Sequence, residues 1–373
     1  MIRTAKAILI LYVLVGLCAP FIANDKPVLV IDKDGTRSWP IFQNGADHDL
    51  FLDTESFQKI IHTPIPFSPD QVTSLKNRYL PPTSQVQLGK RQVRHWLGTD
   101  RLSRDLAAIM VHGCRKSLYI SALAMMLALL IGSILGGAAG FLGNDARIPW
   151  YLLGLNLLCF GYALYLALVL ASYGAALALL AIGLVSSLLL RKRPRPGTKH
   201  ARIWLDTFVM RMIEVFNSIP LLLLLVAASA ILVRPTLTGL AVLIGVMSWT
   251  RFARFSRAEV MRIKEQEYVV AAGISGENSR DILGTYILPE ALPPLLVVLI
   301  FGISSSILLE STLSFLGIGL PIDEMTWGSA LSQVRGNIRA WWLALFPGLA
   351  IFVLIMCLNQ LADHVQDSLR SRQ

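Results

Sequence analysis

Long apolar runs alternate with short polar stretches along this chain. Four of the runs are each close to the roughly 20 residues that an α-helix needs to cross a bilayer: residues 7–23, 117–141, 291–309 and 341–361. Two more spans are expected between residues 201 and 250, separated by the turn signal Arg234-Pro235. The pattern therefore predicts an all-α polytopic membrane protein.

A further apolar stretch covers residues 150–190. It is long enough for two spans joined by a tight turn near Ser172-Tyr173-Gly174. Basic residues follow it from Arg191 to Arg195 and return the chain to the side it came from. Eight spans result: a core of six and an inserted two-helix hairpin, for which peripheral packing or lipid contact is the expected role.

The composition agrees with a membrane protein. Of the 373 residues, 54% are apolar and only 16% are charged, and the mean hydropathy is +0.58. The net charge of +10 does not indicate nucleic-acid binding, because the cations cluster in short loops between spans, where they set orientation. The scattered cysteines give neither a disulfide framework nor metal-ligand spacing.

The distribution of Lys and Arg predicts a multi-pass inner-membrane protein with both termini in the cytoplasm. The expected parts are a first span at 1–23, a small irregular extracytoplasmic lobe at 24–116, a second span at 117–145, the hairpin with a basic cytoplasmic loop at 146–200, and the remaining core at 201–373. The opening residues also look like a signal peptide, and Leu17-Cys18-Ala19 like a lipoprotein signal. An uncleaved span is favoured, because Leu17 stands where lipoprotein signals have Gly or Ala and the apolar run continues to Ala23.

The sequence lacks the motifs of the common enzyme classes. GxxxxGK[ST], HExxH and GxSxG are absent, so the sequence predicts no catalytic residue, no metal site, no cofactor and no ATP binding by the chain itself. If the protein performs driven work, the energy must come from a partner.

The polar, basic segment at residues 251–290 must face water. Within it, Ala271-Ala272 is followed by Gly276, and nine residues later by Tyr286-Ile287-Leu288-Pro289. Small alanines let a helix sit closely in a partner's groove, and a glycine can adopt the positive φ of a sharp turn. This spacing resembles the EAA loop of ATP-binding-cassette (ABC) importer permeases. Taken alone, the motif could also be a chance Ala-Ala-Gly in an ordinary linker.

The resemblance implies that this segment couples the permease to cytoplasmic ATPases. The residues that would carry the coupling are Glu267, Ala271, Ala272, Gly276, Leu288 and Pro289. Two positions depart from the family pattern: Val270 replaces the motif glutamate, and Tyr286 stands where the family has Ile or His. Glu267 lies one helical turn before Val270 and is the candidate for the missing acidic contact.

A second motif lies shortly before residue 117. The stretch HWLGTDRLSRDLAAIMVHGCRKSL is similar to a run in dipeptide and oligopeptide permeases of the C type, with Ser103 and Cys114 as departures. The matching residues include Gly98, Thr99, Asp100, Arg104 and Asp105. A structural role, with Asp105 at the start of an interfacial helix, is favoured over direct contact with substrate.

A third match to peptide permeases begins at Glu310 and ends at Gly328. Glu310 is a candidate for the translocation path, because an ionisable group at the edge of the apolar region is costly and often functional. The alternatives are a helix cap or an ion pair with Arg335 or Arg339.

The resemblance as a whole implies a permease subunit of a peptide ABC importer. Its partners would be a second permease subunit, two cytoplasmic ATP-binding subunits and an extracytoplasmic substrate-binding protein. The entry Ala23-Asn24-Asp25-Lys26-Pro27 further resembles the microcin C-type peptide importers. A permease for nickel or another small solute remains an alternative, as does a membrane sensor or enzyme without ATPase partners.

Overall fold

The structure is a computed structural model of the chain. It describes residues 2–34, 36–42, 57–73, 75–88, 91–144, 146–148, 201–229, 236–321 and 324–371. The predicted hairpin at residues 150–190 lies outside the described residues. The chain divides into two units: one comprises Met1–Ala122 and Ile303–His364, and the other Leu123–Gly302 and Val365–Gln373.

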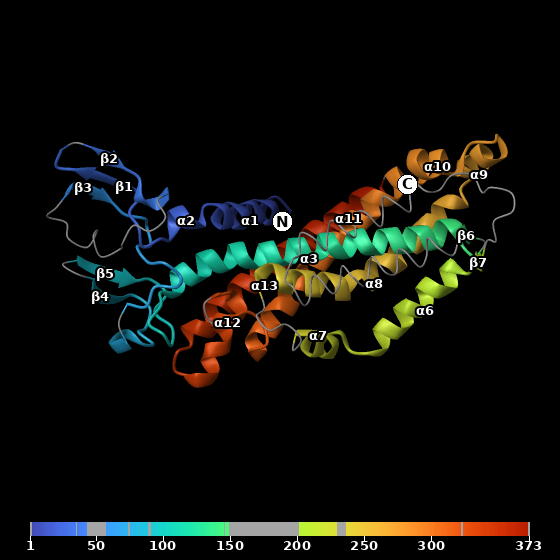
Figure 1. The fold of residues 1–373 in the computed structure, drawn as a ribbon. Helices are drawn as coiled ribbons and strands as arrows, with labels where there is room; N and C mark the ends of the chain where they lie inside the picture. The colour runs from blue at the N-terminus through green and yellow to red at the C-terminus, as the bar shows by residue number, and fades with distance from the viewer. Residues whose placement is uncertain are drawn as a thin grey trace. The chain divides into compact units, whose positions relative to one another are not determined.

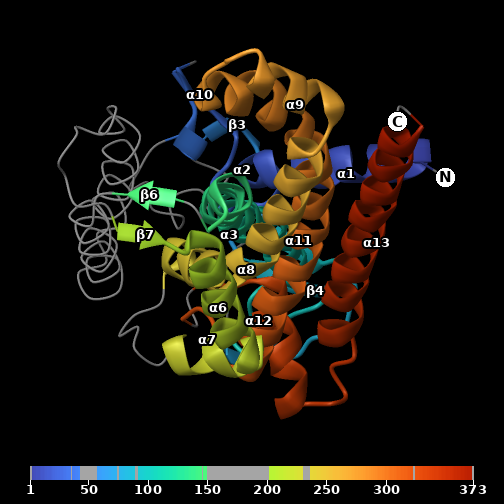
Figure 2. The same ribbon diagram turned by 90° about the vertical axis from the view of Figure 1, so that its right-hand side faces the viewer.

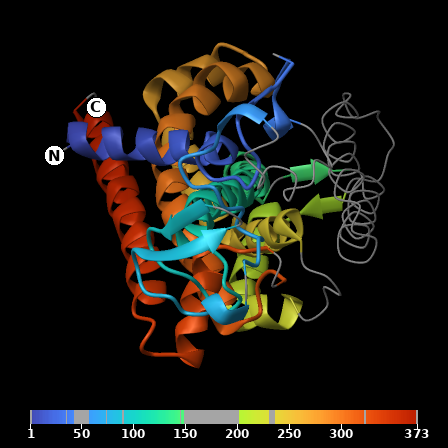
Figure 3. The same ribbon diagram turned by 90° about the vertical axis from the view of Figure 1, so that its left-hand side faces the viewer.

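Short strands build the lobe of the first unit (Figures 1 and 3). In an antiparallel sheet, β1 (Leu29–Asp32) lies between β2 (Arg37–Ser38) and β3 (Phe57–Ile61). A hairpin is formed by β4 (Ser84–Leu88) and β5 (Arg91–His95), and two short 3-10 turns are η1 (Pro40–Phe42) and η4 (Leu75–Asn77). The lobe is therefore more regular than the sequence suggested.

Helices complete the first unit. They are α1 (Ile2–Leu17), α2 (Ala19–Ile22), the start of α3 (Leu106–Leu142), the end of α11 (Leu288–Leu316), α12 (Trp327–Ser332), the 3-10 turn η6 (Gln333–Gly336) and most of α13 (Trp342–Arg370). Leu106, Ile109 and Leu343 are among the buried residues of their shared core. α3 begins well before residue 117, because the Asp105 carboxylate accepts the Ala108 N–H at 2.8 Å and caps the helix there.

In the second unit, glycines bring α3 into backbone contact with α8 (Leu237–Lys264). A Cβ added at Gly132, Gly136 or Gly140 would meet backbone atoms of α8, and at Gly136 it would overlap the Ala253 carbonyl. Close backbone approach is how helices associate in lipid, where burial of apolar surface provides no drive. The glycine face of α3 is therefore the surface that contacts α8.

The first of the two spans expected between residues 201 and 250 is broken at Pro220. α6 (Leu205–Ser218) and α7 (Leu221–Ser229) meet at 82°, and Ile219 between them is extended, with φ −102° and ψ 132°. Proline disfavours the helical conformation of the residue before it, which explains the bend. Nearby, β6 (Ala146–Ile148) pairs antiparallel with β7 (Ala201–Ile203) and joins the chain on either side of residues 149–200.

Three helical segments of the described chain have the length and composition to cross a membrane: Leu106–Leu142, Ser279–Leu316 and Trp342–Arg370. The bent pair α6 and α7 makes a fourth if it is counted as one span. The described part is thus mostly helical and contains several apolar helices. α1, at 16 residues, is shorter than a typical span.

Candidate functional site

The basic segment at residues 251–290 is helical through most of its length. Its first part continues α8 to Lys264, although the sequence placed the end of the span near residue 250. Three short elements then follow: α9 (Glu267–Ile274), α10 (Ser279–Asp281) and the π-helix η5 (Ile282–Ile287). Figure 2 shows α9 and α10 at the ends of α8 and α11, so the segment is held by two long helices.

α9 has one buried and one exposed face. Val269 and Ala272 are buried. The opposite face, which we name the α9 stripe, has the i, i+3, i+4, i+7 spacing of one helix side and consists of Glu267, Val270, Ala271 and Ile274. Val270 is 48% exposed and Ile274 is 84% exposed. Of the two predicted alanines, therefore, only Ala271 lies on the exposed side.

Gly276 ends α9 through a Schellman motif. Its φ is +85°, the Gly276 N–H donates to the Gly273 carbonyl at 3.2 Å, and the Glu277 N–H donates to the Ala272 carbonyl at 3.2 Å. Glycine adopts this left-handed conformation without the penalty that a Cβ brings. The positive φ that the sequence spacing predicted for Gly276 is confirmed.

Apolar packing and a polar network brace α9 against the two long helices. The buried residues of the apolar cluster are Val260, Ile263, Val269, Ile287 and Ala291. Tyr268 of α9 donates a hydrogen bond to Glu290 of α11, and Arg262 of α8 binds the same carboxylate at 3.1 Å. Burial, followed by the bond to Glu290, raises the pKa of Tyr268 to about 12, so its hydroxyl stays protonated and donates at neutral pH.

The end of the motif lies where η5 passes into α11. The Leu288 N–H bonds to the Leu283 carbonyl in the π pattern, directly before Pro289, which has no N–H to donate. Leu288 is half exposed. Tyr286, one of the two departures from the motif, donates its hydroxyl to Glu277 at 3.1 Å and so contacts the turn that ends α9.

The second motif forms a buried, hydrogen-bonded cluster of side chains between β5 and α3, which we call the knot. Its members are Gly98, Thr99, Asp100, Arg104 and Asp105. The Asp100 carboxylate accepts the backbone N–H groups of Leu102 and Arg104 at 2.8 Å each, and it binds Arg104 Nε at 2.8 Å. Gln333 Nε2 donates to the same carboxylate at 3.2 Å. The knot therefore joins this loop to the turn after α12.

Asp105 and Gly98 complete the knot. Asp105 Oδ2 lies 2.7 Å from His95 Nδ1, while its other oxygen caps α3. Gly98 has φ +85°, and a Cβ there would lie 2.6 Å from a backbone carbonyl oxygen. Because every member of the knot is buried, its geometry favours the structural role over direct contact with substrate.

Glu310 is fully buried inside the first unit, although the sequence placed it near the outer edge of its span. Its carboxylate accepts hydrogen bonds from Ser314 at 3.0 Å and from Ser117 of α3 at 3.3 Å. Arg335, one of its two expected ion-pair partners, instead donates to the Phe315 carbonyl. Glu310 therefore ties α3 to α11, and its role in a translocation path stays a prediction.

The sequence interpretation missed one contact of the second unit. Asp206 of α6 binds Arg257 of α8 through two hydrogen bonds, one of them 2.7 Å long. Fifty-one positions separate these residues, and a single sequence carries no signal for such a pair. Among the described residues, no cluster of three or more His, Cys, Asp or Glu side chains is arranged to hold a metal ion.

Comparison with known proteins identifies the family. The family model described as Binding-protein-dependent transport system inner membrane component matches residues 197–371. A protein of Brucella suis biovar 1 (strain 1330), named as a peptide transport system permease protein, is 30% identical over 301 residues, which cover 80% of this chain and 78% of that protein. The chain belongs to the binding-protein-dependent transport system inner membrane components.

Two further relatives of this transport component carry more specific names. The Di/tripeptide transport system permease protein DppC of Pseudomonas aeruginosa (strain UCBPP-PA14) is 28% identical over 305 residues, 82% of this chain and 80% of that protein. The Dipeptide transport system permease protein DppC of Bacillus subtilis (strain 168) is 28% identical over 298 residues, 79% of this chain and 72% of that protein.

As a member of this family, the transport component is a multi-pass inner-membrane protein. It is the membrane part of a transport system and not an enzyme by itself, and such systems also contain ATP-hydrolysing subunits and a binding protein. The matched residues 197–371 include Glu310 and the whole basic segment at residues 251–290, which we name the α9 segment. The knot at residues 98–105 lies before them.

Proposed function

We propose that this chain is a permease subunit of an ATP-driven importer that moves peptides or peptide-like compounds across the inner membrane. The names of its relatives support this substrate class, since they describe peptide, dipeptide and di/tripeptide transport. The knot at residues 98–105 supports it as well, because its sequence resembles the peptide-permease motif.

The α9 segment is the proposed site of coupling. The observation that carries this assignment is a short helix that exposes one stripe, ends in a left-handed glycine turn and is braced on α8 and α11. On the stripe, Glu267 supplies the acidic contact, while Val270 and Ile274 supply an apolar one. The partners are two cytoplasmic ATP-binding subunits, of which one contacts this stripe, a second permease subunit and an extracytoplasmic substrate-binding protein.

Coupling follows from the stiffness of this arrangement. When the ATPases close, the helix that they hold moves with them. The buried cluster around Ile263 and the network around Glu290 transmit the displacement to α8 and α11 without letting α9 tilt on its own. The close glycine contact joins α3 and α8 as one packed unit, and a switch between outward and inward access requires such a tightly packed bundle.

The proposed topology has six core spans and an inserted hairpin, with both termini in the cytoplasm. The domain limits are those expected from the sequence: 1–23, 24–116, 117–145, 146–200 and 201–373, with the coupling segment at 251–290. The pairing of β6 with β7 supports an insertion, because it joins the core on either side of residues 149–200.

Peptide consumption tests the function. Cells that lack the chain and cells that express it are grown on a casein digest, and peptides remaining in the medium are quantified by mass spectrometry. We expect a set of peptides to disappear only when the chain is present and ATP is available. If the two cultures leave identical peptides while nickel uptake differs, the peptide assignment is wrong.

A further inference from the structure

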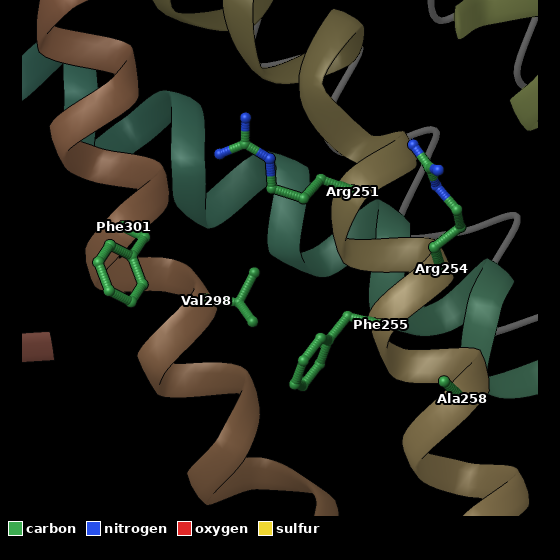
Figure 4. Close-up of a pocket in the computed structure, with 6 residues that line it drawn as sticks. All are labelled: Arg251, Arg254, Phe255, Ala258, Val298 and Phe301. Carbon is green, nitrogen blue, oxygen red and sulfur yellow. The ribbon is translucent and has the colours of Figure 1, made fainter. Parts of the chain in front are cut away.

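A groove of about 490 Å³ lies between α8 and α11 in the second unit. Its lining residues come from two helices that run in opposite directions: Arg251, Arg254, Phe255, Ala258, Val298 and Phe301. Figure 4 shows Phe255 and Val298 in the space between the helices, and Arg251 reaching across above them. The groove thus combines an apolar wall with two cationic side chains.

The position of these arginines along α8 sets the depth of the groove. From Leu237 to Thr250 the helix carries no charge, and from Arg251 to Lys264 it carries five cationic residues. The first charges after an apolar run mark where a helix leaves the hydrocarbon for the headgroup region. Arg251 and Arg254 are the first two, so the groove lies at the level of lipid phosphates.

Arg251 and Arg254 are both exposed, and both line the groove. Residues three positions apart lie on the same side of a helix, so the two guanidinium groups come from one side of α8.

We propose that this groove binds an anionic phospholipid, whose phosphodiester contacts Arg251 and Arg254 while its acyl chain lies against Phe255, Val298 and Phe301. Guanidinium groups bind phosphate oxygens through paired, charge-assisted hydrogen bonds. A basic pocket between membrane helices on the cytoplasmic side is a known setting for anionic headgroups. The proposal requires only that α8 and α11 enter the membrane, and it is independent of the transported substrate.

Two features favour a lipid over other anions. A free phosphate would use the arginines but gain nothing from the three apolar side chains beside them. A carboxylate from a partner subunit would match the charge, but it would have to be delivered to this depth by a particular chain. Phosphodiesters, in contrast, surround the protein at this level of the membrane.

Lipid retention and thermal protection test the site on the intact complex, purified from native membranes with its co-purifying subunits. The double variant Arg251→Gln/Arg254→Gln is compared with wild type and with Arg3→Gln/Arg370→Gln, which removes the same charge from exposed positions at the two ends of the chain. Native mass spectrometry counts bound phospholipids, and the unfolding midpoint is measured with added phosphatidylglycerol, phosphatidylcholine or inorganic phosphate.

We expect wild type and the control to retain phosphatidylglycerol and to be protected by it, but not by phosphatidylcholine or inorganic phosphate. The groove variant should lose on the order of tenfold or more in apparent affinity, because charge-assisted hydrogen bonds to the phosphate are removed. The proposal is overturned if phosphatidylglycerol protects all three proteins equally. It is also overturned if inorganic phosphate protects wild type as well as phosphatidylglycerol does, or if Ala258→Cys crosslinks to a second permease subunit without bound lipid.

Discussion

Replacing Gly276 with valine isolates the conformational requirement of the turn after α9. Gly276 has φ +85°, and nothing lies within 4 Å of the point where a Cβ would sit, so the cost of a Cβ here comes from the backbone conformation and not from a contact with neighbouring residues. A non-glycine residue in the left-handed region costs about 1–2 kcal/mol, and a β-branched one at least the upper value. The equilibrium between the native turn and other conformations should therefore shift away from the turn by a factor of roughly 30 or more.

The consequence should appear in coupling and not in membrane insertion. Losing the turn removes the two hydrogen bonds that close α9, from the N–H groups of Gly276 and Glu277. We expect the amount of chain in the membrane to be unchanged, while ATPase subunits retained on purification, and ATP-dependent uptake, fall about as much as the turn population does.

A matched control lies three residues away. Gly273 is inside α9 and is equally open, but its backbone is helical, so Gly273→Ala should be neutral or should stabilise the helix by up to about 1 kcal/mol. Asparagine tolerates the left-handed region, so Gly276→Asn should fall between wild type and valine. If valine retains the ATPases as wild type does, or if Gly273→Ala loses them equally, the turn is not the coupling element.

Three other predictions test the packing and the topology. Gly136→Ala should lower the thermal midpoint, because its Cβ would overlap the α8 backbone, whereas Gly137→Ala, with 3.4 Å to the nearest atom, should leave the midpoint unchanged. Asp100→Ala leaves Arg104 buried without its carboxylate, which costs about 3–5 kcal/mol, and should make the lobe sensitive to protease well below the wild-type midpoint. Deleting residues 150–190 should keep a C-terminal tag in the cytoplasm, because a pair of spans is removed; a tag on the outer side would contradict the hairpin.

Features governed by local backbone chemistry could be predicted from the sequence. The four-residue spacing of Gly132, Gly136 and Gly140 puts three side-chain-free positions on one helix face, and such a face in lipid has close helix contact as its use. Gly276 could be assigned a positive φ, because a turn directly after a short helix commonly needs one.

Features governed by distant residues could not be predicted. The partner of Glu310 in α3, Ser117, is 193 positions away, and no local pattern encodes that meeting. The continuation of α8 to Lys264 was missed for a different reason. Hydropathy reports whether a residue faces water, and a helix that leaves the membrane becomes polar without ending. The bend at Ile219 was signalled by Pro220, but the surrounding apolar run masked it.

Crosslinking from the α9 stripe tests the central claim most directly. A photoreactive amino acid replaces Ile274, which is 84% exposed, or Ile338, an equally open isoleucine at 83% in the turn before α13. After irradiation of native membranes, crosslinked partners are identified by mass spectrometry. The coupling account predicts an ATP-binding subunit on residue 274 and none on residue 338. An ATP-binding subunit on residue 338, or none on residue 274 in a complex that still takes up peptides, would contradict it.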